Sequence, residues 1–119
     1  MSRIVSGILK GIYLDVFPDE CMRPTSNRAK EALFDIIQFD IKAKSFIDLF
    51  SGTGQIGIEA LSRGASKVIF VEKSKKSLNI LTKNIKKISS IVDLKSIEIY
   101  KNDAFKFLDQ FKNKTDFNP

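Results

Sequence analysis

The central part of the chain alternates between short apolar runs and stretches in which apolar residues recur at helical spacing, a pattern typical of an α/β domain. The runs are rich in Ile, Val and Phe and predict buried strands. The expected elements are a strand over 45–50, a helix over 55–63, a strand over 68–71, a helix over 74–89, a strand over 96–101 and a helix from about residue 104. This order implies a parallel sheet with right-handed crossovers.

Upstream of this pattern, residues 3–16 combine β-branched residues with glycines and predict a short hairpin, closed by turn residues at 17–20. Ser26 is the expected N-cap of a helix over 27–38. The apolar residues of that helix share one face, which is expected to be buried: Ala29, Leu33, Ile36 and Ile37.

The helix predicted over 74–89 has the clearest division into two faces. Its apolar positions point inward, and they are Leu78, Leu81, Ile85 and Ile88. Its lysines lie on the other side, at positions 76, 83, 86 and 87. Gly64 stands where a glycine commonly ends a helix, just past the one predicted over 55–63.

We expect one domain over 1–119, with a hairpin extension over 1–17 and a strand–helix unit repeated three times over 45–119. Three such units make only half of a doubly wound sheet. A parallel sheet needs cover on both faces and at its edges. The chain is therefore expected to be the front part of a larger domain, or to be completed by a partner.

The composition of the chain limits the kinds of catalytic and metal site that it can form. The chain has 119 residues, 43% of them hydrophobic, one cysteine (Cys21) and no histidine. These counts exclude histidine-based catalysis and an intrachain disulfide, and they argue against a metal site. No apolar run approaches the roughly 20 residues of a membrane span, and no secretory signal is visible. We therefore expect a soluble, cytoplasmic protein without metal or membrane.

The net charge of +6 is concentrated in one stretch. Residues 62–101 carry ten basic and three acidic side chains, whereas the rest of the chain is nearly neutral. A basic surface of this kind attracts polyanions, nucleic acid above all. The alternative is a solvated, lysine-rich face without a partner.

A glycine-rich turn carries the sharpest chemical signal. Gly52, Gly54 and Gly57 match G-x-G-x-x-G between a predicted strand and a predicted helix, where a nucleotide-type ligand can approach the backbone closely. Glu72 follows Gly52 by 20 residues, at the end of the next strand, where a carboxylate can accept from both ribose hydroxyls. The alternative is a simple turn and a surface carboxylate.

Asp48 separates two classes of ligand. Its carboxylate lies close to the turn, where it would repel the pyrophosphate of a dinucleotide but attract the amine of S-adenosylmethionine. Asp48 is alternatively a satisfied turn carboxylate. Asp103, after the third strand, is placed to accept from the exocyclic amine of an adenine, and it also suits a helix N-cap.

Two stretches resemble a known family. Residues 48–65 read Asp-Leu-Phe-Ser-Gly-Thr-Gly-Gln-Ile-Gly-Ile-Glu-Ala-Leu-Ser-Arg-Gly-Ala, and Val-Glu-Lys follows at 71–73, similar to class I S-adenosylmethionine-dependent methyltransferases. Residues 23–34 read Arg-Pro-Thr-Ser-Asn-Arg-Ala-Lys-Glu-Ala-Leu-Phe, which resembles a second hallmark of the RsmD group. That group methylates the N2 amine of a guanine in 16S ribosomal RNA. Residues 3–11 resemble its opening hairpin. Asn27 and Lys30 depart mildly from the group's Asp and Arg.

The resemblance implies a Rossmann-like methyltransferase fold, S-adenosylmethionine as cofactor, and 16S rRNA or an assembling small ribosomal subunit as partner of a monomer. It assigns cofactor binding to Asp48, Phe50, Ser51, Gly52, Thr53, Gly54, Gly57, Glu72, Lys73, Asp103 and Ala104. It assigns RNA contacts to Arg3, Lys10, Arg23, Thr25 and Arg28.

The family's catalytic element, Asp/Asn-Pro-Pro-Tyr/Phe after a fourth strand, is expected to be missing. Asn118 and Pro119 begin such a motif only superficially, because no apolar strand precedes them. No catalytic residue is therefore assigned, and the chain alone is expected to be inactive. Two other readings stay open: an inactive RNA- or partner-binding remnant, and a dinucleotide-binding domain.

Overall fold

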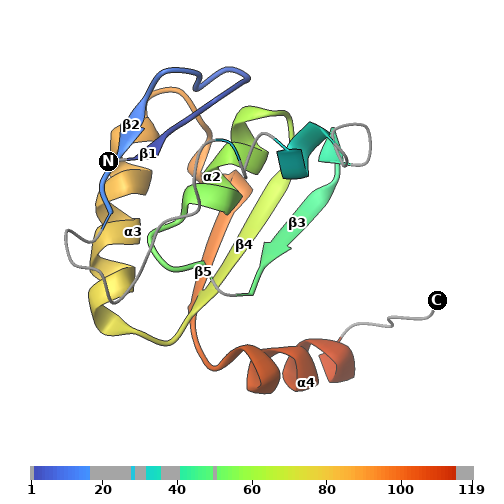
Figure 1. Cartoon of the computed structure of the whole chain (residues 1–119). Coiled ribbons are helices and arrows are strands. Elements are labelled where there is room, and N and C mark those ends of the chain that lie inside the picture. The colour runs from blue at the N-terminus through green and yellow to red at the C-terminus, as the bar shows by residue number, and fades with distance from the viewer. Residues whose placement is uncertain (1, 17–27, 29–31, 36–40, 50, 115–119) are drawn as a thin grey trace.

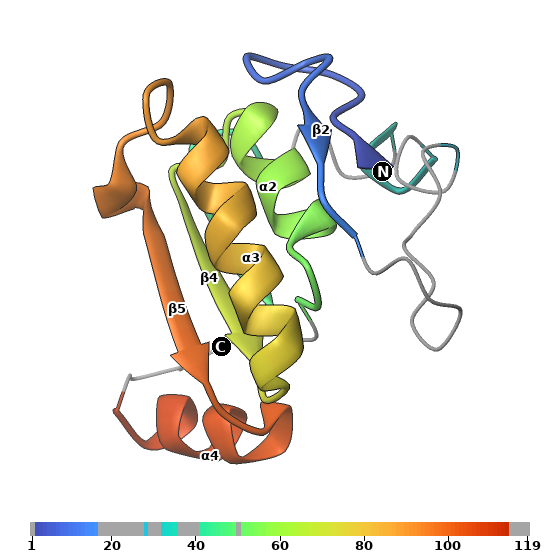
Figure 2. The ribbon, with the colours of Figure 1, turned by 90° about the vertical axis from the view of Figure 1, so that its left-hand side faces the viewer.

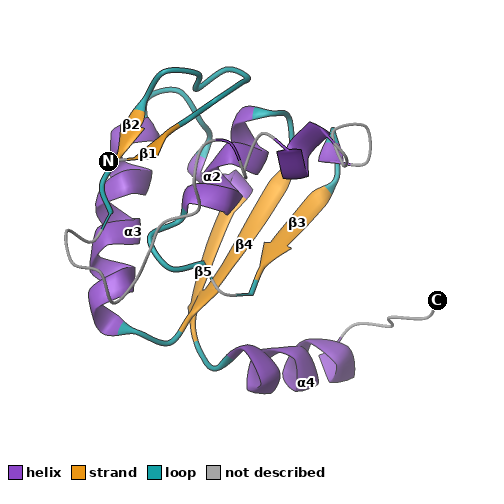
Figure 3. Cartoon of the chain, viewed as in Figure 1, coloured by secondary structure: helices purple, strands orange, loops and turns teal. Residues whose placement is uncertain are grey.

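The computed structural model describes residues 2–16, 28, 32–35, 41–49 and 51–114, without the side chains of Ser2 and 111–114. Figures 1 and 3 show how the elements follow one another. The strands are β1 (Ser2–Arg3), β2 (Tyr13–Leu14), β3 (Ser45–Asp48), β4 (Lys67–Glu72) and β5 (Ile97–Lys101). The helices whose bounds fall within the described residues are α2 (Gln55–Ser62), α3 (Lys75–Ile88), the 3₁₀ helix η1 (Leu94–Ser96) and α4 (Ala104–Lys114), and residues 32–35 are helical as well.

Within the described residues, β3, β4 and β5 form a parallel sheet in that order, with β4 in the centre. In the register, Asp48 pairs with Phe70, and Glu72 pairs with Lys101. The strands therefore end at one common edge, from which the glycine-rich turn and the start of α4 both emerge (Figure 1). The predicted parallel α/β arrangement is confirmed.

Strand β4 is apolar on both faces because helices cover it from two sides. Val68 and Phe70 belong to the main core, beneath α2 and α3, which lie on the same face of the sheet (Figure 2). Ile69 and Val71 face the other way and pack with Phe107 of α4. This double burial explains why the strand reads as one continuous apolar run.

The inner face of α3 matches its apolar pattern. Leu81, Ile85 and Ile88 are buried, and Leu78 packs against the same core while remaining partly exposed. The lysines predicted to face outward are exposed. Ser74 caps the helix by accepting a hydrogen bond from the backbone N–H of Ser77. Gly64, with φ of 109°, follows the last turn of α2 as predicted.

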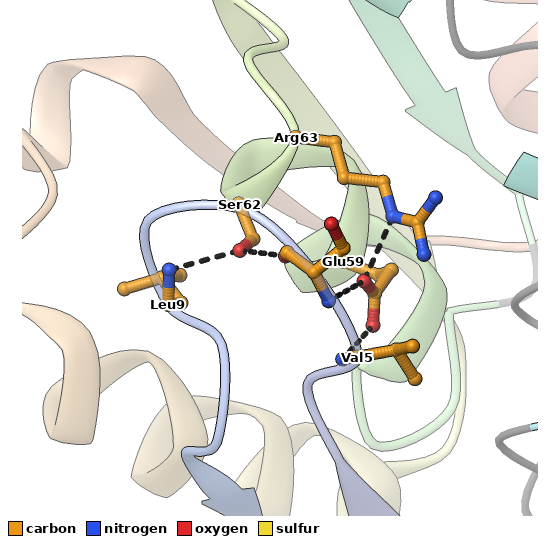
Figure 4. A network of polar contacts seen from close by, with 6 residues as sticks. Val5, Leu9, Glu59, Ser62 and Arg63 are labelled. Atoms are coloured by element: carbon orange, nitrogen blue, oxygen red, sulfur yellow. Dashed lines mark hydrogen bonds and ion pairs between the residues drawn. The ribbon is translucent and has the colours of Figure 1, made fainter.

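The N-terminal hairpin consists of an antiparallel pair, β1 with β2, joined by a long loop that lies on α2. The buried carboxylate of Glu59 accepts from the N–H groups of Val5 and Ser6, at 3.0 and 3.1 Å. Ser62 Oγ accepts from the N–H of Leu9 and donates to the carbonyl of Ser6. Figure 4 shows this network, which anchors the loop to the C-terminal end of α2.

One expectation about the helix predicted over 27–38 is wrong. Leu33 is 40% exposed, whereas Phe34, which lies off the predicted face, is completely buried. The Phe34 ring packs 6.4 Å from that of Phe46, and the Arg63 guanidinium lies 4.8 Å from its centroid. The larger aromatic ring therefore occupies the buried position. Ser26, Ala29, Ile36 and Ile37 lie outside the described residues.

Candidate functional site

The candidate site lies at the carboxyl edge of the sheet, where the chain turns from β3 into α2. Gly52 and Gly54 have φ of 54° and 96°, a region of backbone conformation that favours glycine. The N–H of Gly54 donates to the carbonyl of Ser51 at 2.8 Å, which closes the turn, and Gly54 is the N-cap of α2. Parallel α/β sheets commonly bind ligands at this edge.

The three glycines of the motif differ in the space around them. A Cβ atom on Gly54 would lie 2.4 Å from Leu81 Cδ1, and one on Gly57 would lie 2.3 Å from Phe70 Cε1. These two glycines therefore let the helix pack closely on its neighbours. A Cβ atom on Gly52 would meet nothing within 4 Å. Gly52 is thus the glycine of the motif that leaves open space beside the backbone, which is where a ligand can approach.

Glu72 holds the glycine turn against the end of β4. Its Oε1 accepts from the N–H of Gly52 at 2.8 Å, and its Oε2 accepts from the N–H of Ser74 at 2.9 Å. The carboxylate is partly exposed. Each carboxylate oxygen can accept more than one hydrogen bond, so these two contacts leave acceptor capacity for a ligand's hydroxyls.

Asp48 sits at the end of β3, beside the first turn of α2. Its Oδ2 accepts from the N–H of Gly57 at 3.2 Å. The N-cap glycine offers no side-chain acceptor, so Asp48 satisfies one of the open N–H groups at the start of the helix. The interpretation of Asp48 as a satisfied turn carboxylate describes this contact. It remains compatible with a second contact to an amine.

Asp103 and Ala104 close the other side of the site. Asp103 Oδ1 accepts from the N–H groups of Phe105 and Lys106, at 2.9 and 3.2 Å, so the expected N-cap role is present. A small hollow of about 140 Å³ lies beside them. It is lined by Leu49, Glu72, Lys73, Asn102, Asp103, Ala104 and Phe105. The structure therefore brings Glu72, Lys73, Asp103 and Ala104 together.

Ser51 and Thr53 are buried, and their side chains contribute to the turn itself. Ser51 Oγ donates to the carbonyl of Val71 at 3.2 Å, and Thr53 Oγ1 accepts from Gln55 Nε2 at 2.6 Å. Both hydroxyls therefore already have a partner within the protein. Lys73 is exposed, and Phe50 lies outside the described residues.

Of the predicted RNA contacts, Lys10 is the one whose place relative to this site follows from the hydrogen bonds of the described residues. Lys10 is exposed on the hairpin loop, whose Ile8 N–H donates to the carbonyl of Ser62 at 2.9 Å. Ser62 is the last residue of α2, so Lys10 lies toward the end of that helix opposite the glycine turn. Arg3 and Arg28 are exposed, and Arg23 and Thr25 lie outside the described residues.

Among the residues that the structure describes, the ionisable groups with a clear pKa shift lie away from the site, on β5. Hydrogen bonds from Lys67 and then from Tyr100 lower the pKa of the Glu98 carboxyl. The same contact with Glu98 raises the pKa of the Tyr100 hydroxyl. These groups pair β5 with β4 at the sheet surface.

The site offers backbone N–H groups, carboxylates and a small partly apolar hollow, which suit an organic ligand with hydroxyl and amine groups. In the part of the chain that the structure describes, no group of three or more His, Cys, Asp or Glu could hold a metal ion. Among the same residues, no helix is both long and apolar enough to cross a membrane.

Sequence reasoning missed Asn84, which is fully buried beneath the turn. Its Nδ2 donates to the carbonyl of Thr53 at 2.8 Å. A signal was present in the pattern, because Asn84 is a polar residue three positions after Leu81 and four before Ile88, within the apolar stripe of α3. Glu59 on α2 was missed in the same way.

Comparison with curated proteins identifies relatives that are longer than this chain. Ribosomal RNA small subunit methyltransferase D of Haemophilus influenzae is 36% identical over 116 residues, covering 98% of this chain and 59% of that protein. The protein of the same name from Buchnera aphidicola subsp. Acyrthosiphon pisum is 35% identical over 111 residues, covering 93% of this chain and 56% of that protein. The chain thus spans little more than half of each.

Solved structures show the same fold. A structure from Escherichia coli, described as a candidate methyltransferase, superposes with a TM-score of 0.76 at 30% identity, covering 90% of this chain and 55% of that one. A hypothetical protein of Thermus thermophilus gives 0.78 at 25% identity, covering 96% and 63%. The family described as Conserved hypothetical protein 95 matches residues 2–118. The chain therefore belongs to that family, and its predicted resemblance to the RsmD group of methyltransferases is confirmed.

Proposed function

We propose that this chain binds S-adenosylmethionine at the carboxyl edge of its sheet and is the cofactor-binding portion of a ribosomal RNA methyltransferase. The observation that carries the proposal is the bond from the Gly52 N–H to Glu72, which places a carboxylate beside the open glycine of the turn. The names of the curated relatives support the reaction class.

The residues at the site fit this cofactor. Glu72 is placed to accept from the ribose hydroxyls, and Asp48 to attract the methionyl amine near the start of α2. The hollow beside Asp103 and Ala104 suits the adenine, with Asp103 as an acceptor for its exocyclic amine. When bound, the cofactor supplies a methyl group on a positively charged sulfur, and this chain holds and orients it.

The proposed substrate is the N2 amine of a guanine in small-subunit ribosomal RNA, as naked RNA or within an assembling subunit in the cytosol. The exposed lysines of α3 provide positive charge for such a polyanion. The amine needs little help from a base before attack, so positioning supplies most of the catalysis. The Asp/Asn-Pro-Pro-aromatic element that would orient the amine is not among these 119 residues.

A dinucleotide cofactor is less compatible with the site. Pyrophosphate binds at open N–H groups of a helix N-terminus. Here the carboxylate of Asp48 already accepts from the Gly57 N–H in the first turn of α2, and its negative charge would repel a pyrophosphate. An inactive remnant without cofactor is the other alternative, and ligand binding separates it from the proposal.

The test is thermal unfolding with saturating S-adenosylmethionine, with NAD as comparison. A ligand at about 100 times its dissociation constant adds roughly 2.7 kcal/mol to the folded state, which raises the midpoint visibly. We expect a rise with S-adenosylmethionine alone. Glu72→Ala should abolish the rise, whereas Glu98→Ala, which removes a carboxylate from the neighbouring strand, should preserve it. A rise with NAD, or none with either ligand, would overturn the proposal.

A further inference from the structure

The side chain of Asn84 is completely buried on the inner face of α3, and both ends of its amide are used. Its Nδ2 donates to the carbonyl of Thr53 at 2.8 Å and to the carbonyl of Asp15 at 2.9 Å. Its Oδ1 accepts from the N–H of Asp15 at 2.7 Å. One amide therefore contacts two backbone segments that are distant in sequence.

These two segments belong to different parts of the molecule. Thr53 lies between Gly52 and Gly54 in the turn of the candidate cofactor site. Asp15 follows β2, where the hairpin ends, and its own carboxylate pairs with Lys87 on the surface at 3.0 Å. The hydrogen bonds of Asn84 therefore bring the end of the hairpin and the glycine turn to the same position of α3.

An amide is the group that this position requires. It supplies two N–H donors and an acceptor from one short side chain. A carboxylate here would face two carbonyl oxygens and would have no proton to donate to either. A leucine of similar shape would leave the Asp15 N–H and two carbonyls without this partner, at a cost that burial makes large.

From this geometry we propose that Asn84 is a positioning residue that holds the glycine turn in its binding conformation and couples it to the segment after β2. Because the amide fixes the Thr53 carbonyl, it restrains the peptide units on either side, which contain the open glycine and the N-cap of α2. The expected effect on cofactor affinity rests on the proposed function, whereas the coupling between the two segments is independent of it.

The experiment compares Asn84→Ser and Asn84→Asp with Asn79→Asp, which places the same new charge on an exposed position of the same helix. Asn84→Ser introduces no charge, so it remains informative if Asn84→Asp does not fold. Amide hydrogen exchange reports on the two segments through the N–H groups of Asp15, Gly52 and Gly54. Calorimetry gives the dissociation constant of S-adenosylmethionine for each folded variant.

We expect Asn84→Ser to speed exchange at all three amides and to raise the dissociation constant about ten-fold, while Asn79→Asp changes neither. Unchanged exchange at Gly52 and Gly54 would overturn the proposal, as would faster exchange without loss of affinity. If the unaltered chain does not bind S-adenosylmethionine, the proposed function fails, and hydrogen exchange alone then decides whether Asn84 couples the segments.

Discussion

At the scale of single residues, the glycine motif is a set of three separate requirements. Gly54 and Gly57 have no room for a methyl group, because Leu81 and Phe70 pack against them. Gly52 has room for a methyl group, but that group would fill the open space beside the backbone of the turn. Sequence motifs of this kind therefore combine packing and binding constraints that only contacts can separate.

Gly52→Ala is predicted to keep the fold and weaken cofactor binding. The positive φ of 54° should cost about 1–2 kcal/mol of unfolding free energy, and the new methyl group would occupy the open side of the turn. We expect the dissociation constant for S-adenosylmethionine to rise more than about ten-fold, equivalent to about 1.4 kcal/mol. Urea unfolding and calorimetry measure the two effects.

Gly11→Ala is the matched control for this variant. Gly11 also has a positive φ, 89°, and no atom within 4 Å of an added Cβ, but it lies on the hairpin loop. It should lose a similar amount of stability and keep its affinity for the cofactor. Equal affinities for the two variants would mean that the open side of Gly52 does not face the ligand.

At the scale of elements, α2 is fastened at both ends. The carboxylate of Asp48 accepts a hydrogen bond from the first turn of the helix. Its last turns bind the hairpin loop through Glu59 and Ser62 (Figure 4). The Arg63 guanidinium lies 2.9 Å from the Glu59 carboxylate and stacks over Phe34. The loop is therefore held by Ser62 and by a buried carboxylate, which accepts from two backbone N–H groups and from Arg63.

Glu59→Ala is predicted to detach the hairpin loop from α2. The change leaves the N–H groups of Val5 and Ser6 without their acceptor and Arg63 without its partner, which should cost about 3 kcal/mol. Urea unfolding measures the loss, and limited proteolysis should cut the loop faster. Glu98→Ala, at a surface ion pair, should change stability by less than about 1 kcal/mol. Equal losses for both variants would contradict the prediction.

At the scale of the whole molecule, the sheet is covered unequally. One face carries α2, α3 and the hairpin, whereas the other carries a small cluster around Ile69, Val71 and Phe107. Tyr100, which pairs with Val71 and whose ring lies 5.2 Å from that of Phe107, is 42% exposed, and Phe105 of α4 is 71% exposed. The chain also spans little more than half of the curated relatives. The described residues therefore include the proposed cofactor site and cover the second face of the sheet only in part.

We predict that this chain, supplied with S-adenosylmethionine, transfers no methyl group to naked small-subunit RNA or to assembled subunits. The physical reason is that nothing among its 119 residues provides the proline-rich motif that would hold the target amine. Incorporation of labelled methyl groups measures the activity, with the longer Haemophilus influenzae relative assayed in parallel. Incorporation that Glu72→Ala removes would contradict the prediction.

The sequence by itself determined the order of the elements, the parallel sheet, and the placement of Gly52 and Glu72 at a common edge. Each of these follows from local information: the apolar periodicity, the strand lengths, and the 20-residue spacing between Gly52 and Glu72, which α2 and β4 span. The family resemblance also rests on contiguous motifs. The failure at Leu33 and Phe34 came from a helix whose buried face depended on aromatic contacts with Phe46 and Arg63.

Only the tertiary structure decided which partner each polar residue has. Asn84 contacts Thr53 and Asp15 across 31 and 69 positions of the chain, and Glu59 contacts Val5 across 54. Periodicity indicates that such a residue lies on an inner face, but it carries no information about which distant backbone group arrives there. Hydrogen bonds between remote segments exist only once packing brings the segments together, because their geometry tolerates errors of only a few tenths of an ångström.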